Sequence, residues 1–378
     1  MNITNLQLYR GISRKLINIF KPRRSACLHP NIQYNQRNGY LMTLCQHSSA
    51  AAPNGSSPMA MVFDRKAKRN QRNRTAFLKN YEDYDYIKEE FGFRLYDRIC
   101  DIKRQFNLMV ELGCGRGHIA KHITADIVTD RIIQCDWAEQ VLNQAAISKE
   151  VKTEKRIVDE ESIPFEPNSI DIVVSNLSLH WVNDLPGSLK QINNCLKEDG
   201  VLIGSMFGHE TLFELRVALQ QAELELEGGF GIHVSPFAEC TDIGRLLNQA
   251  GFTLITLDLD ALVVSYPSMI ELLQDLKGMG ENNCTLNRKT HLHRKTVKRA
   301  AEIYQEKFGN EGKESIPATF EVIHFIGWKP HPSQAKPAKR GSGQMSIKDL
   351  GEFEKIAKER KIHVISDTDV DATKKDDS

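Results

Sequence analysis

The stretch VELGCGRGH at residues 110–118 decides the fold. An apolar run ends in Glu111, and alternating glycines follow it: Gly113, Gly115 and Gly117. Glycine lets the backbone turn tightly and approach a ligand without an intervening Cβ, and a helix starting there offers unpaired N–H groups. A dinucleotide site would require a further glycine where this chain has His118. The stretch therefore predicts a strand, a loop that contacts a nucleoside ligand and a helix over 117–125.

Outward from this loop, short apolar segments alternate with amphipathic ones. The expected strands span 107–112, 131–135, 154–158, 170–175, 200–206, 252–264 and 318–328. The expected helices span 117–125, 138–149, 185–197, 210–227, 241–250, 267–277 and 288–308. Such alternation predicts a parallel sheet with helices on both faces. We expect a Rossmann-like α/β fold with a mainly parallel seven-stranded sheet, in which 318–328 forms an antiparallel edge strand.

Three polar residues follow the next expected strands. Asp136 lies about twenty residues beyond the glycine loop, where a carboxylate can accept hydrogen bonds from both ribose hydroxyls of a nucleoside. Asp159 follows the third strand, in position to meet an adenine, and Asn176 ends the fourth. The carboxyl ends of parallel strands are where open α/β sheets bind ligands. Together these residues predict a nucleoside-cofactor site.

The N-terminal segment has a different composition. Its first acidic residue is Asp64, after seven lysines and arginines, and residues 9–20 form an amphipathic stripe. Such a basic, acid-free leader is typical of a mitochondrial transit peptide, here residues 1–45, although a basic terminus without a targeting role has the same composition. Residues 46–95 are expected to form a linker and a helical extension. The basic run 65–72 in that extension is interpreted as a solvated helix face, with a partner-binding face as the alternative.

The remaining chain is expected to form one domain over 96–330, followed by a mostly disordered tail over 331–378 that contains a short helix at 346–360. Within the domain, 208–237 has glycines and aromatic residues typical of a substrate lid, and an ordinary long connection would look similar. Without the leader, the chain is net negative, which argues against a broad nucleic-acid surface. No apolar run is long enough to span a membrane, and association with a membrane surface stays open.

The residues from Glu111 to Gly117, then Asp136, Asp159 and the run NLSLHW at 176–181, resemble the class I S-adenosylmethionine-dependent methyltransferases. The branch with the malonyl-acyl-carrier-protein methyltransferase of biotin synthesis is especially similar. The resemblance implies S-adenosyl-L-methionine as cofactor. It implies that Glu111, Gly113, Gly115 and Gly117 hold its amino-acid part. It also implies that Asp136 holds the ribose, that Asp159 holds the adenine, and that Asn176 lines the pocket.

From residue 62 to about residue 350, the chain also resembles a family of mitochondrial complex I assembly factors that act as arginine hydroxylases. The resemblance is carried by residues 62–65, 84–98, 235–237, 325–330 and 339–342. It implies hydroxylation of an arginine in the iron–sulfur subunit near the quinone site, together with other assembly factors as partners. It also implies a peripheral location on the matrix side of the inner membrane, which agrees with the leader.

The reaction itself stays open at this point. No histidine is followed two residues later by an acid, the usual start of an iron-binding facial triad, so no metal ligand and no catalytic residue is assigned. His180 and Trp181 are interpreted as packed or substrate-shaping residues. Arginine hydroxylation is the preferred function. The alternatives are methyl transfer to a protein or small acid, which needs little beyond orientation, and an assembly chaperone without enzymatic activity.

Overall fold

The computed structural model describes residues 61–289, 291–310 and 315–336. The expected transit peptide, most of the expected linker and the tail helix at 346–360 lie outside these residues. All of the helices and strands named below belong to one compact unit that ends at His331. None of the helices in this described part is both long and apolar enough to cross a bilayer.

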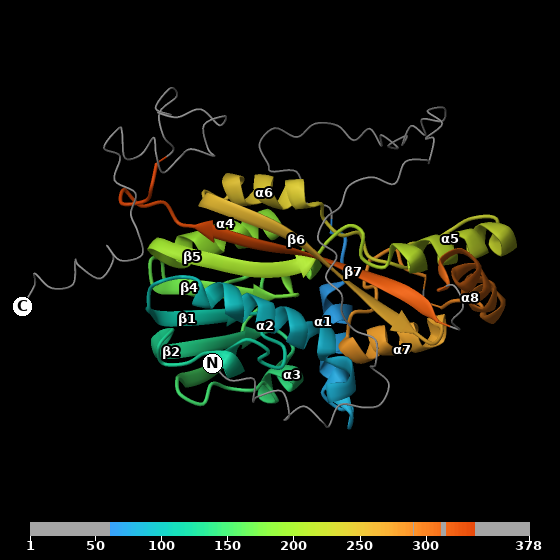
Figure 1. Cartoon of the computed structure of the whole chain (residues 1–378), viewed down its shortest axis with the longest axis horizontal. Helices are drawn as coiled ribbons and strands as arrows, with labels where there is room; N and C mark the ends of the chain where they lie inside the picture. The colour runs from blue at the N-terminus through green and yellow to red at the C-terminus, as the bar shows by residue number, and fades with distance from the viewer. Residues whose placement is uncertain (1–60, 290, 311–314, 337–378) are drawn as a thin grey trace, which may run out of the picture. The chain divides into compact units, whose positions relative to one another are not determined.

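A seven-stranded sheet runs through this unit in the order β3-β2-β1-β4-β5-β7-β6 (Figure 1). Its strands are β1 (Phe106–Leu112), β2 (Val128–Asp136), β3 (Lys152–Ile157), β4 (Ile170–Asn176), β5 (Leu196–Phe207), β6 (Thr253–Tyr266) and β7 (Ile316–Trp328). The first five strands pair in parallel, and β7 is antiparallel to both β5 and β6. The expected α/β fold with a mainly parallel seven-stranded sheet is therefore confirmed.

One detail of the sheet differs from the expectation. The strand expected at 318–328 as the edge is β7, which lies one place further in, and β6 is the outermost strand. The sheet still ends in an antiparallel pair. Sequence patterns predict that a strand exists, but pairing partners depend on tertiary contacts.

The helices are α1 (Arg65–Thr75), α2 (Tyr86–Cys100), α3 (Glu139–Asn143), α4 (Leu185–Cys195), α5 (Phe213–Glu227), α6 (Cys240–Gln249), α7 (Met269–Met279) and α8 (Arg294–Phe308). Several begin at a side chain that caps the first turn. Asp64 accepts from Ala67 N, and Ser268 accepts from Ile270 N. These caps satisfy N–H groups that a helix leaves unpaired.

Apolar side chains cover both faces of the parallel strands. On one face, where Figure 1 shows α2 in front of the parallel strands, Leu95 and Ile99 of α2 belong to one buried cluster with Met109 of β1. On the other face, α4 and α6 contribute Leu189 and Leu247 to a second cluster. Because alternate residues of a strand point to opposite faces, each strand supplies both clusters.

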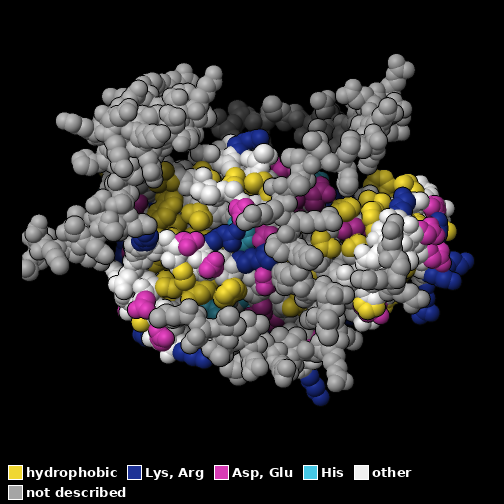
Figure 2. Space-filling model, in the orientation of Figure 1, with side chains coloured by type: hydrophobic (Ala, Val, Ile, Leu, Met, Phe, Trp, Pro, Cys, Tyr) yellow, Lys and Arg dark blue, Asp and Glu magenta, His cyan; other side chains and the backbone are white. Residues whose placement is uncertain are grey.

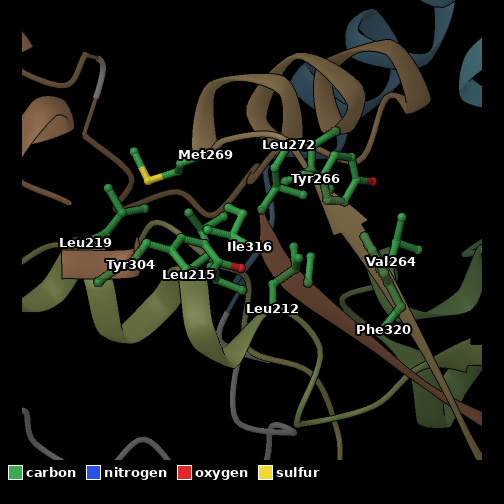
Figure 3. Packing of buried hydrophobic residues seen from close by; sticks show 14 of the residues in the cluster. Leu212, Leu215, Leu219, Val264, Tyr266, Met269, Leu272, Tyr304, Ile316 and Phe320 are labelled. Atoms are coloured by element: carbon green, nitrogen blue, oxygen red, sulfur yellow. The ribbon is translucent and has the colours of Figure 1, made fainter. Parts of the chain in front are cut away.

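A third core lies where β6 and β7 extend past the parallel strands. Figure 3 shows side chains from α5, α7 and α8 converging on the ends of these two strands. Leu215, Leu272, Tyr304 and Phe320 are all buried in this cluster. This core holds α7 in place, and Met279 at the end of α7 borders the cavity described below.

Two expected helices are wrong or much shorter. Over 117–125 the chain forms turns and one 3₁₀ turn, η2 (Ala120–His122), instead of an α-helix. β-branched residues disfavour a helix there, and Ile119 and Ile123 are buried against the sheet. The helix expected at 138–149 is only α3, because Ala146 N instead donates to Arg116 O at 2.8 Å.

Charged side chains tie α2 to the edge strand. Arg94 pairs with Asp260, and Arg98 pairs with Asp258 at 2.7 Å. Figure 2 shows basic and acidic side chains next to one another on this face, without one extended patch of a single sign. Helix α2 also runs across residue 96 without a break, so it joins the expected extension to the domain.

Candidate functional site

The carboxyl ends of β1 and β4 lie side by side at the point where the strand order reverses, and a cavity of about 30 Å³ opens there. Its lining comprises Arg72, Thr75, Asp85, Lys88, Gly113, Cys114, Gly115, Arg116, His118, Asp136, Val141, Asn176, Leu177 and Met279. Of the residues predicted for the site, Gly113, Gly115, Asp136 and Asn176 line this cavity, whereas Glu111, Gly117 and Asp159 do not.

The three loop glycines have different surroundings, although all have positive φ. A Cβ at Gly113 would lie 2.1 Å from Ser178 Oγ, and one at Gly117 would lie 2.2 Å from Ala146 O. At Gly115 nothing lies within 4 Å of such a Cβ. Gly113 and Gly117 are thus required by packing. Gly115 faces open space that a ligand can enter.

Glu111 lies beneath the loop and is 1% exposed. Its Oε2 accepts a hydrogen bond from Gln134 Nε2 at 3.1 Å, and its Oε1 accepts one from Ile119 N at 3.4 Å. Burial raises the pKa of Glu111 to about 7, against these hydrogen bonds. In this arrangement the side chain supports the turn that follows the loop. Its contact with a cofactor stays a prediction.

Asp136 and Asn176 border the cavity from two strands. Asp136 accepts hydrogen bonds from Gly115 N at 2.9 Å and Ala138 N at 2.7 Å, so its carboxylate fixes the loop at the cavity wall. Asn176 accepts from Ser205 Oγ at 2.9 Å and donates to Lys88 O at 2.9 Å. The residue after it, Leu177, has φ of 47°, a strained conformation that is common at functional sites.

Asp159 is engaged by a different partner. Arg65 Nη2 lies 2.5 Å from its carboxylate and 2.5 Å from that of Glu160. Glu160 is fully buried and also pairs with Arg72 at 3.1 Å. Burial would raise the pKa of Glu160, but Arg72 and Arg65 outweigh it and lower the pKa to about 2. The acidic residues after β3 therefore bind the cations of α1 in this structure.

The interpretation of the basic run 65–72 as a solvated face is wrong for one side of α1. Arg65, Lys68 and Arg72 are buried, whereas Lys66 and Arg74 are exposed. The buried cations are spaced three and four residues apart, which places them on one face of a helix. Their burial is compensated by acceptors on other segments. Arg72 forms ion pairs with Glu160 and Asp136, and Lys68 donates to the backbone carbonyl of Gly280. The helical spacing of the three cations is a signal that the sequence carries, but it does not identify their partners.

The opposite wall carries Arg116, which joins the glycine loop to the N-terminal helices. Its guanidinium lies 3.1 Å from Asp85, donates to Thr75 O at 2.8 Å and stacks on the Tyr81 ring at 3.9 Å. Tyr81 therefore lies beside the site. Tyr84 and Tyr86 instead pack against the core of α7 and β6.

A further group of buried polar side chains adjoins the cavity near His180 and Trp181. Trp181 Nε1 donates to Glu281 at 2.7 Å, and Lys88 Nζ lies 3.0 Å from the same carboxylate. Phe237, from the expected lid at 208–237, packs on both rings, with ring centroids 5.6 Å from His180 and 6.2 Å from Trp181. His180 and Trp181 are thus packed residues, and Phe237 brings the 208–237 segment to the site.

The residues around the cavity fit the cofactor that the resemblance implies, although the cavity itself is too small for it. Arg72 and Arg116 suit a carboxylate, Asp136 suits ribose hydroxyls, and the open space at Gly115 admits a ligand. A nucleoside cofactor requires on the order of 300 Å³ or more. Arg72 and Thr75 of α1 belong to this lining, so we expect α1 and its side chains to move when a cofactor binds. Within the described residues, no three or more His, Cys, Asp and Glu side chains group as a metal site.

Comparison with known proteins identifies relatives over most of the chain. A family described as "Methyltransferase domain" matches residues 110–204. The chain is 50% identical over 295 residues to "Arginine-hydroxylase NDUFAF5, mitochondrial" of Danio rerio, which covers 78% of this chain and 91% of that protein. The protein of the same name from Homo sapiens is 49% identical over 311 residues, or 82% of this chain and 89% of its own.

A bacterial protein named for a different activity is more distantly similar. "Malonyl-[acyl-carrier protein] O-methyltransferase" of Gallionella capsiferriformans is 33% identical over 281 residues, covering 72% of this chain and 93% of the bacterial protein. Both resemblances that were expected from the sequence are therefore confirmed, and the animal relatives share more residues with this chain than the bacterial one.

Proposed function

Because the chain belongs to the NDUFAF5 family of mitochondrial arginine hydroxylases, we propose that it hydroxylates an arginine side chain of a protein substrate. The observation that carries this proposal is the identity of about half of all residues over nearly the full length of the relatives. The similarity extends well beyond the methyltransferase domain match at 110–204, because it covers 78% of this chain.

We propose S-adenosyl-L-methionine as the cofactor of the cavity at β1 and β4. Arg72 and Arg116 would hold its carboxylate, Asp136 its ribose, and Gly115 would leave room for its chain. When bound, this cofactor supplies a sulfonium centre with an electrophilic methyl group, and it supplies no oxygen atom. Hydroxylation would therefore also consume dioxygen and a two-electron reductant, with one oxygen atom inserted into a C–H bond of the arginine side chain and the other released as water. The protein's own residues orient it, and α1 covers it from solvent.

The substrate and location are proposals drawn from the family resemblance. The proposed substrate is an arginine of the complex I iron–sulfur subunit near the quinone site, modified during early assembly together with other assembly factors. The relatives are named as mitochondrial proteins, and the basic leader has the composition of a segment that targets a protein to mitochondria. We propose peripheral association with the matrix side of the inner membrane.

Two alternatives have an observation in their favour. The methyltransferase domain match and the similarity to a malonyl-carrier methyltransferase favour methyl transfer to a protein or small acid. The cavity lining is already paired within the chain, as Arg72 is with Glu160, which favours a chaperone whose cofactor site is structural. The two alternatives differ from hydroxylation in what they add to the substrate.

Mass spectrometry of the iron–sulfur subunit, from mitochondria with and without this protein, tests the three functions. Hydroxylation predicts one added oxygen on a single arginine, present only with the protein. One added methyl group would replace our proposal with methyl transfer. An unchanged mass together with failed complex I assembly would leave the chaperone. Re-expression of the wild-type protein in the mitochondria that lack it should restore the added oxygen.

A further inference from the structure

The turn after α7, residues 279–282, presents four acceptors for positive charge, and we name it the acceptor turn. Its backbone carbonyls at Gly280 and Asn282 accept from Lys68 Nζ at 3.0 and 2.7 Å. The carbonyl of Met279 accepts from Lys88 Nζ at 2.9 Å, and the same ammonium lies 3.0 Å from Glu281 Oε1. Two lysines from two different helices thus meet at four consecutive residues.

This convergence is unusual because lysine is almost never fully buried. Lys68 is 1% exposed, and the Glu281 side chain is 4% exposed. The last carbonyls of a helix also carry partial negative charge, and Gly280 ends α7 with φ of 74°. The acceptor turn is therefore a built cation site, and in this structure the chain's own lysines fill it.

Aromatic and unpaired groups complete the site. Lys68 Nζ lies 3.4 Å from the centre of the Trp181 ring, so the indole presents its face to a cation. His180 Nε2 lies 3.6 Å from Glu281, and among the described residues neither ring nitrogen of His180 has a hydrogen-bond partner. A buried side chain with unused polar atoms indicates a place where a ligand can bind.

The acceptor turn is continuous with the cofactor cavity. Met279 belongs to both. Lys88, which donates to the turn, also lines the cavity, and Asn176 at the end of β4 donates to the backbone of Lys88. A group held at Glu281 would therefore lie beside the proposed cofactor. This is the position that a reacting side chain requires.

On the basis of the proposed function, we propose that the acceptor turn is the subsite for the guanidinium of the substrate arginine, and that Lys68 and Lys88 occupy it in the absence of substrate. Glu281 is the specificity-determining residue. A guanidinium suits this site better than an ammonium does, because it is planar, donates two parallel hydrogen bonds to a carboxylate and stacks on an aromatic ring.

The charges of the cluster agree with this exchange. Burial would raise the pKa of Glu281, but Lys88 and its other basic neighbours outweigh it and hold the pKa well below its usual range, so the carboxylate stays ionised. Burial lowers the pKa of Lys68 to about 7, against the opposing charge of Glu281. A lysine that loses its proton near neutral pH is more easily displaced by an arginine that keeps its own.

The test measures binding of Nα-acetyl-arginine amide and of its neutral isostere, Nα-acetyl-citrulline amide, to the full chain loaded with S-adenosylmethionine. Calorimetry should show at least roughly ten-fold tighter binding of the arginine compound, the expected effect of a charge-assisted hydrogen bond. Glu281→Gln should abolish this preference. Glu214→Gln, a buried glutamate on α5 that bonds to Thr319, should keep it.

Equal binding of the two compounds to the wild-type protein would overturn the subsite, and this measurement needs no variant to fold. A preference that survives in Glu281→Gln would also overturn it, because the cation would then bind elsewhere. The proposed function fails separately. If the preference is present and depends on Glu281 but the subunit gains no oxygen, the guanidinium subsite stands and hydroxylation does not.

Discussion

The two walls of the cofactor cavity are held in different ways. The loop wall, residues 111–117, follows a buried strand, and it is fixed by backbone hydrogen bonds and by glycines packed against their neighbours. The helix wall, α1, buries Arg65, Lys68 and Arg72, and few apolar side chains. One wall is therefore part of the hydrophobic core of the sheet. The other is fixed mainly by ion pairs.

This difference bears on which wall moves. Burying apolar strands contributes directly to stability. In a buried ion pair, the attraction between the charges is largely offset by the cost of removing them from water. Charged groups of a cofactor or substrate can also replace the partners of a buried cation, but nothing equivalent replaces a strand. We therefore expect the loop wall to be rigid and the helix wall to be the part that opens.

The largest expected effect comes from breaking the helix wall at Glu160. Glu160→Gln leaves Arg65 and Arg72 buried without this carboxylate. Removal of one partner of a buried pair costs about 3–5 kcal/mol in the free energy of unfolding. Urea unfolding of the cofactor-free protein, followed by circular dichroism, measures it.

The matched control is Glu154→Gln. Glu154 on β3 also pairs with three cations, Arg131, Lys152 and Arg156, but its side chain is partly exposed. Its unfolding midpoint should stay within error of the wild type. If the two variants unfold alike, the ion pairs of α1 are not what holds the helix wall.

A smaller effect is expected from filling the loop wall at Gly115. Gly115→Val places a side chain in the open space of the cavity, so S-adenosylmethionine should bind roughly 100-fold more weakly or not at all, since a branched side chain occupies its place. Gly228→Val is the control, because Gly228 has a similar φ of 70° and equally open surroundings at the end of α5. Calorimetry that shows unchanged affinity for Gly115→Val would place the cofactor elsewhere.

The loop wall could be predicted from the sequence because its signals are local. Each strand was recognised from an apolar run, and Gly113–Gly117 from the spacing of the glycines. The polar residues at strand ends followed, and the structure does bring Asp136 and Asn176 to the same cavity as Gly115. Backbone conformation and strand patterns depend on neighbouring residues, which is why short-range patterns succeed here.

The helix wall could not be predicted in the same way. A basic run is normally solvated, and nothing near α1 in the sequence shows that Glu160 or the carbonyl of Gly280 will accept its hydrogen bonds. Those partners lie some 90 and 210 residues further along the chain. The early end of α3 has a similar cause, since Ala146 bonds to the glycine loop. Glu281 is not predicted because its partners come from two distant segments, α2 and the turn at 179–181.

The smallest predicted effect is on the pH dependence of stability, which should have opposite signs for a group in the loop wall and a group in the helix wall. Burial raises the pKa of Glu111, in the loop wall, from 4.5 to about 7. Between these values the folded protein keeps a proton that the unfolded chain loses, so the stability contribution of Glu111 falls as pH rises. Burial lowers the pKa of Lys68, in the helix wall, from 10.5 to about 7. There the unfolded chain keeps the proton, so its contribution rises with pH.

Unfolding free energies of wild type and Lys68→Met, measured in urea between pH 7 and 9, test the helix wall. As the pH rises, the free energy of unfolding of the wild type should increase relative to that of the variant by up to about 1.4 kcal/mol per pH unit. Lys66→Met removes an exposed lysine of the same helix. Its free energy of unfolding should change with pH by the same amount as that of the wild type. A constant difference for Lys68→Met would mean that Lys68 stays charged in the folded protein. The acceptor turn would then hold a permanent ammonium, and a substrate guanidinium would have to displace a full positive charge to reach Glu281.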